Sequence, residues 1–126
     1  MEDNKENVCS AAPTLIFACS GAADVGAITD RAARKLTQRM GPGKMYCLAG
    51  IGGRVAGILK TTEEAEKILA IDGCPLDCVK LSLEEAGFAE FEHIKVTDLG
   101  LEKGKSPATD ENIATIVQAA LFKISD

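Results

Sequence analysis

The feature that most constrains this chain is a regular alternation of short apolar runs with amphipathic segments of helical spacing. The apolar runs are typical of buried strands, and they span residues 14–18, 45–49, 68–72 and 91–97. The amphipathic segments have the spacing of helices, and they span residues 23–40, 53–60 and 75–86 and the chain from 109 or 110 onward. This alternation predicts an α/β fold, in which helices cover both faces of a parallel sheet.

We therefore expect a single three-layer domain with a four-stranded, mostly parallel sheet of the Rossmann-like or flavodoxin-like kind. This domain is expected to span residues 14–126, and residues 1–13 are expected to form a polar N-terminal tail. The chain has 126 residues, which suits one domain, and 46% of them are hydrophobic, which is enough for a core. Right-handed crossovers bring the carboxyl ends of parallel strands to one edge, where such sheets bind ligands.

Four of the five cysteines lie close to the carboxyl ends of predicted strands. Cys19 follows the first strand, Cys47 lies within the second, and Cys74 and Cys78 follow the third. Pro75 suits the first position of a helix, so Cys74 is the expected N-cap and Cys78 lies one turn further on. A helix start also stabilises negative charge such as that of a thiolate. The sequence thus predicts four thiols at the ligand-binding edge.

Composition excludes several classes of partner. The formal net charge is −5, whereas nucleic-acid binding needs clustered Lys and Arg. No apolar run approaches the ~20 residues of a membrane span. The chain begins with an acidic segment, where a secretory signal needs positive charge, so we expect a cytoplasmic protein with reduced thiols. The fifth cysteine, Cys9, lies in the predicted tail and is expected to take no part in the site.

Metal binding is the function that this set of cysteines favours. Four thiolates suit a tetrahedral zinc ion, and a set of three would leave one position open to water or substrate. Cysteine also ligates iron–sulfur clusters, which we regard as the less favoured cofactor. The separation of Cys74 and Cys78 by three residues is less diagnostic than a Cys-x-x-Cys pair.

Two other interpretations of the cysteines stay open. In the first, the protein is a thiol-dependent redox enzyme or transferase with Cys74 as nucleophile and Cys78 as resolving thiol. In the second, the cysteines are inert small residues of the core. Whether the protein is an enzyme is therefore left open by the residues themselves.

Two groups of residues have features of anion-binding turns, so a small anionic ligand is a further expectation. The first group comprises Ser20, Gly21 and Asp24, and the second comprises Gly52, Gly53 and Arg54. The first begins a helix, where anions bind, but has neither a Walker nor a Gly-x-Gly-x-x-Gly pattern. The second follows Cys47 and resembles a cysteine-phosphatase loop, but the spacing between Cys47 and Arg54 is one residue too long for that loop.

The other polar residues near strand ends have structural explanations. Asp72 and Asp77 are expected to cap the following helix or to face solvent, with support of metal ligands as the alternative. The single histidine, His93, lies within the fourth strand, away from its carboxyl end, and is not expected to be a ligand. Residues 100–108 are expected to form an ordinary connection rather than a lid.

Three motifs in order along the chain resemble the DGC-domain family, described as zinc-binding proteins of bacteria and archaea. They are Cys19-Ser20-Gly21-Ala22-Ala23-Asp24, Cys47-Leu48-Ala49-Gly50-Ile51-Gly52-Gly53 and Asp72-Gly73-Cys74. The resemblance covers roughly residues 14–125. It implies that Cys19, Cys47, Cys74 and Cys78 are the zinc ligands, and it supplies no reaction.

Overall fold

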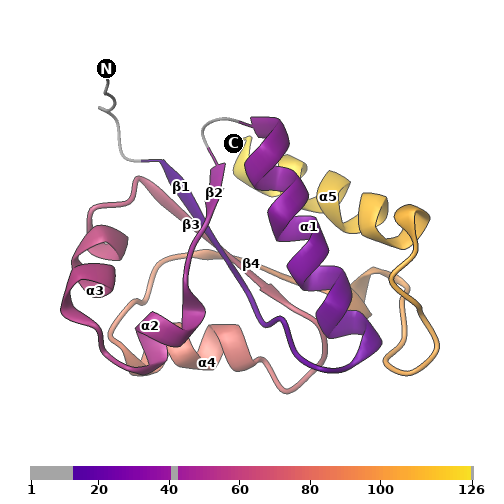
Figure 1. The fold of residues 1–126 in the computed structure, drawn as a ribbon, viewed down its shortest axis with the longest axis horizontal. Helices are drawn as coiled ribbons and strands as arrows, with labels where there is room; N and C mark the ends of the chain where they lie inside the picture. The colour runs from indigo at the N-terminus through magenta and orange to yellow at the C-terminus, as the bar shows by residue number, and fades with distance from the viewer. Residues whose placement is uncertain (1–12, 41–42, 126) are drawn as a thin grey trace.

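A computed structural model describes residues 13–40 and 43–125, and these residues form one four-stranded, fully parallel sheet. The strands are β1 (Thr14–Ala18), β2 (Gly43–Met45), β3 (Lys67–Asp72) and β4 (Glu92–Lys95). Their order across the sheet is β2-β1-β3-β4, which is the order of the first four strands in flavodoxin-like sheets (Figure 1). The predicted α/β class is confirmed. The predicted tail and Cys9 lie outside the described residues, apart from Pro13.

Helices cover both faces of the sheet (Figure 1). One layer holds α1 (Asp24–Met40) and α5 (Asp110–Ile124), which pack against each other. The other layer holds α2 (Leu48–Gly52), α3 (Ala56–Glu63) and α4 (Cys78–Glu85). A 3-10 helix, η2 (Val96–Leu99), follows β4. No helix in the described part of the chain is long and apolar enough to cross a membrane.

Each central strand contributes to two cores because its side chains alternate between the faces. Leu69 and Ile71 of β3 are fully buried in the cluster beneath α1 and α5. Ile68 and Ala70 of the same strand belong to the cluster beneath α2 and α4. A strand buried on both sides needs apolar residues at every position, which explains its continuous apolar run.

The segment after β2 differs from the sequence prediction. Strand pairing extends only to Tyr46, whose amide donates to the carbonyl of Ile16, and the chain then turns into α2. A helix here buries Ile51 completely against the core beneath α2 and α4. The predicted strand 45–49 and helix 53–60 are therefore wrong in their bounds, and Cys47 is the N-cap of α2 rather than a strand residue.

Two further boundaries differ because neighbouring elements determine them. β4 ends at Lys95 because its partner β3 ends at Asp72, which pairs with Lys95, so the predicted strand 91–97 is too long. The predicted helix 75–86 begins at Cys78 instead, and its N-cap is Asp77 rather than Cys74. The cause of this shift is the Asp72 carboxylate, described below.

Close packing of the loop after β1 onto α1 gives a test of the fold. A Cβ atom at Gly26 would clash with the backbone of Gly21, its carbonyl oxygen first, whereas one at Gly57 in α3 would meet nothing within 4 Å. We expect Gly26→Ala to lower the free energy of unfolding by about 1–3 kcal/mol. Gly57→Ala should leave it unchanged or raise it by up to ~1 kcal/mol. Urea denaturation of both variants measures this, and equal effects would contradict the packing described.

Candidate functional site

The candidate site lies at the carboxyl edge of the sheet, where β1 and β3 lie side by side. The chain leaves β1 towards α1 on one face and leaves β3 towards α4 on the other, so the two connections diverge here (Figure 1). Parallel sheets bind ligands at such a point of divergence. The amide of Cys19 donates to the carbonyl of Ile71 at 3.1 Å, which continues the strand pairing as far as the first thiol.

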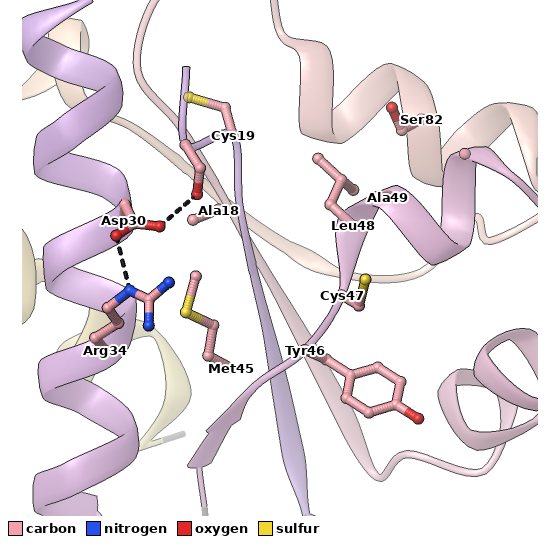
Figure 2. Close-up of a pocket in the computed structure, with 12 residues that line it drawn as sticks. Ala18, Cys19, Asp30, Arg34, Met45, Tyr46, Cys47, Leu48, Ala49 and Ser82 are labelled. Carbon is pink, nitrogen blue, oxygen red and sulfur yellow. Dashed lines mark hydrogen bonds and ion pairs between the residues drawn. The ribbon is translucent and has the colours of Figure 1, made fainter. Parts of the chain in front are cut away.

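Two hollows open at this edge, and Cys19 borders both. The first, which we call the Cys19–Cys47 cleft, has a volume of about 800 Å³. Figure 2 shows Cys19 at the end of β1 and Cys47 at the start of α2 on its two sides. The second, which we call the three-cysteine pocket, has a volume of about 390 Å³ and is lined by Cys19, Cys74 and Cys78.

The thiols gather around one strand end without forming a compact cage. All four are free, with Cys47 and Cys78 exposed and Cys19 and Cys74 half-buried. Among the described residues, no three of the sulfur atoms lie within 4.8 Å of one another. The four-cysteine metal site therefore stays a prediction, and metal binding there would require the loops to move closer together.

The hydroxyl of Thr29 in α1 positions Cys19. This hydroxyl is fully buried, donates to the carbonyl of Gly26 at 2.8 Å and accepts the amide of Ser20 at 3.1 Å. Its oxygen lies 3.4 Å from the sulfur of Cys19. Because the single hydroxyl hydrogen is already given to Gly26, the Cys19 thiol is the donor in this last contact.

Asp24 in α1 holds the connection at residues 100–109 against the three-cysteine pocket. Its carboxylate accepts the amides of Gly104 at 2.9 Å and Ser106 at 3.1 Å. The hydrogen bond from Gly104, more than any other contact, lowers the pKa of this carboxyl below its ordinary value. The loop brings the ammonium of Lys103 to 3.8 Å from the sulfur of Cys74, to which it donates. Cys74 thus has a cation beside its sulfur.

Asp72 at the end of β3 determines where α4 begins. Its side chain is 1% exposed and accepts the amide of Val79 at 2.8 Å and that of Lys80 at 3.1 Å. These amides belong to the first turn of the helix, where they have no partner within it. The expectation that Asp72 caps the following helix is confirmed. Residues 74–77 consequently form a turn, closed by a bond from the amide of Asp77 to the carbonyl of Cys74.

A polar cluster that the sequence analysis missed surrounds Asp72. The Nε2 atom of His93 lies 2.8 Å from Oδ2 of Asp72 and 3.8 Å from Oδ1 of Asp77. Lys95 reaches the same Asp77 oxygen at 3.1 Å, and its hydrogen bond to Asp77 raises the pKa of the lysine. The available signal was the strand period of two, which puts His93 and Lys95 on the same face of β4.

The predicted anion-binding residues have other partners. The hydroxyl of Ser20 donates to Asp30. Asp30 also pairs with Arg34 in the wall of the Cys19–Cys47 cleft (Figure 2). The guanidinium of Arg54 donates to three backbone carbonyls, those of Ile51, Gly52 and Glu85. These contacts direct Arg54 to the ends of α2 and α4. The small-anion site stays a prediction, and the contacts of Ser20 and Arg54 do not favour it. Its proposed residues are Ser20, Gly21, Asp24, Gly52, Gly53 and Arg54.

Comparison with known proteins gives two matches. The sequence profile of the family described as DGC domain matches residues 15–120, a stretch that contains Cys19, Cys47, Cys74 and Cys78. The anaerobic and virulence modulator AnvM of Pseudomonas aeruginosa is 36% identical over 89 residues, which are 71% of this chain and 67% of the relative. No solved structure gives a significant match.

The role of Asp72 can be tested by its removal. We expect Asp72→Ala to lower the free energy of unfolding by about 3 kcal/mol, because the buried amide of Val79 loses a charged acceptor. The control is Asp98→Ala, an exposed acidic residue in η2, which should change it by less than ~0.5 kcal/mol. Chemical denaturation measures both. A loss equal to that of the control would contradict the capping role.

The lowered pKa of Asp24 predicts acid release of the loop at residues 102–106. A carboxyl with a lowered folded pKa contributes stability above its unfolded pKa, and this is lost as the pH falls through the folded value. Hydrogen-exchange protection of the Gly104 and Ser106 amides should therefore persist at neutral pH and fall at a pH below the ordinary Asp value of 3.8. At neutral pH these two amides should be less protected in Asp24→Asn than in the unchanged protein, whereas in Asp98→Asn they should be equally protected. Unchanged protection in Asp24→Asn would exclude Asp24 as the link.

Proposed function

Because the chain belongs to the DGC domain family, we propose that it is a metal-binding protein that holds one zinc ion through four thiolates. The ligands are Cys19, Cys47, Cys74 and Cys78. The observation that carries this proposal is the position of Cys19, which borders both hollows at the edge of the sheet. One hollow adds Cys47 and the other adds Cys74 and Cys78, so all four thiols surround the end of β1.

The donor set fits a thiophilic ion. Zinc takes four sulfur ligands at about 2.3 Å, which places neighbouring sulfurs about 3.8 Å apart. Cys47 precedes α2, and Cys74 lies in the turn that precedes α4, so modest movements of these two segments would bring their sulfurs closer to Cys19. Four thiolates around a divalent ion leave an excess of negative charge, and Lys103 beside Cys74 partly offsets it.

The proposed role is regulatory. AnvM is named as a modulator, and we propose for this chain that metal occupancy changes the position of the turn at residues 73–77 and of the segment before α2. The protein would act in the reducing cytoplasm, where thiols remain available to a metal. The metal-binding domain would comprise residues 14–126, and the tail with Cys9 would take no part.

A second candidate function is thiol chemistry with Cys74 as the nucleophile. The observation that favours it is the contact between the Lys103 ammonium and the Cys74 sulfur, which places a cation and hydrogen-bond donor beside the candidate nucleophile. Cys78 lines the same pocket and would act as the resolving thiol. This function predicts a free, readily alkylated Cys74 in the purified protein, whereas the metal site predicts thiols that zinc protects.

Metal analysis with matched cysteine variants tests the proposal. The protein is purified anaerobically without a metal-binding tag, and we expect about one zinc per chain by mass spectrometry. Each single replacement of a ligand, in Cys19→Ser, Cys47→Ser, Cys74→Ser or Cys78→Ser, should weaken zinc binding at least ~10-fold in competition with a chelating dye. Cys9→Ser is the control, since it changes a cysteine outside the proposed site, and it should bind zinc as the unchanged protein does.

Three outcomes would contradict this assignment. Detection of iron together with inorganic sulfide would mean that the cysteines hold an iron–sulfur cluster instead of zinc. Absence of bound metal, no affinity for added zinc and rapid alkylation of Cys74 would favour the second candidate. Equal zinc binding in Cys9→Ser and in all four site variants would place the metal elsewhere.

A further inference from the structure

Asp72, Asp77 and His93 form a compact group of metal-ligating atoms on the α4 face of the sheet. One atom from each residue lies within 4.8 Å of the others, and among the described residues this is the only group of three that does so. None of the three lines the Cys19–Cys47 cleft or the three-cysteine pocket. The group is therefore separate from the thiols, although Asp77 is adjacent to Cys78 in the chain.

The distances within this group suit chelation of a single ion. Metal–ligand bonds of about 2.1 Å place neighbouring ligand atoms about 3 Å apart at right angles, and somewhat further apart in a tetrahedron. Nε2 of His93 lies 2.8 Å from the nearest oxygen of Asp72 and 3.8 Å from that of Asp77. The amides of Val79 and Lys80 hold the Asp72 carboxylate in place. A carboxylate has about four lone-pair positions, so it retains the capacity to bind a metal.

An incompletely satisfied oxygen faces this group. Oδ1 of Asp77 is buried and has no hydrogen-bond partner. Lys95 lies 3.1 Å from it, but this contact is an ion pair without hydrogen-bond geometry, and the hydrogen bond from Lys95 goes to Oδ2 at 3.4 Å. A buried carboxylate oxygen without a hydrogen bond is costly unless a cation binds it.

We propose that Asp72, Asp77 and His93 form a second, oxygen- and nitrogen-ligated site for a divalent cation, for which the ammonium of Lys95 competes. Two carboxylates and one imidazole suit Mn²⁺, Fe²⁺ or Zn²⁺ rather than a strictly thiophilic ion. In the absence of the ion, Lys95 supplies the positive charge beside Asp77. On metal binding, Lys95 moves away towards solvent and Asp98, whose charge already acts on it.

The proposal does not rest on the thiol site. Its ligands differ in chemistry from cysteine, and its geometry is present without any movement of the cysteine loops. The competition with Lys95 is its distinctive consequence, because removal of a lysine that only stabilised the fold would not strengthen metal binding.

Titration of the full chain with Mn²⁺, followed by the loss of the free-ion signal in electron paramagnetic resonance, tests the site. Mn²⁺ is the probe because it prefers oxygen and nitrogen ligands to thiolates. We expect saturation at one ion per chain. Lys95→Met should bind about tenfold or more tightly, because it removes the cation that lies 3.1 Å from Oδ1 of Asp77 and competes with the ion for that oxygen. His93→Ala and Asp77→Asn should each weaken binding at least ~10-fold.

Two matched controls separate this site from other effects. Lys123→Met removes a lysine that pairs with Glu92 at the surface, and it should leave Mn²⁺ binding unchanged. Cys74→Ser should also leave it unchanged, so failure of the zinc proposal and failure of this one give different results. Circular dichroism confirms that each variant is folded.

The proposal is overturned if neither the unchanged protein nor Lys95→Met binds Mn²⁺ saturably. It is also overturned if His93→Ala and Asp77→Asn bind as tightly as the unchanged protein, or if Lys95→Met has no more effect than Lys123→Met. Binding detected only in Lys95→Met, and lost when His93→Ala is added, supports the competition.

Discussion

The buried carboxylate of Asp72 connects β3, β4 and α4. A carboxylate that is 1% exposed is stable only when charged or polar partners replace its water. Two amides of the first turn of α4 and the imidazole of His93 supply these partners. Because the amides belong to Val79 and Lys80, the helix begins at Cys78, and the preceding turn carries Cys74 to the other side of the sheet edge.

This arrangement separates two kinds of ligand chemistry across one sheet edge. Cys19, Cys74 and Cys78 line one pocket beside the end of β1, and two carboxylates with an imidazole lie beneath α4. Soft and harder ligands select different ions, so the two proposed sites need not compete for one metal. Asp77 and Cys78 are neighbours at the start of α4, so the position of this helix start affects both sites.

Much of the fold could be predicted because it depends on long apolar patterns. β1 and α1 lie within one residue of their predicted bounds, and α5 begins at a predicted residue, since each presents a continuous run or stripe that must be buried. The bounds between residues 45 and 63 could not be predicted in the same way. There, burial of Ile51 and the pairing of Tyr46 with Ile16 decide where the strand ends and the helix begins.

The sequence by itself determined the α/β class and the placement of Cys19, Cys47, Cys74 and Cys78 near one edge of the sheet, because strand–helix alternation requires parallel strands that end together. Only the tertiary structure decided that His93 meets Asp72 and Asp77 and that Lys103 reaches Cys74. These contacts join residues 16 to 29 positions apart. Such contacts depend on strand register and on the course of a loop, and no local periodicity encodes either.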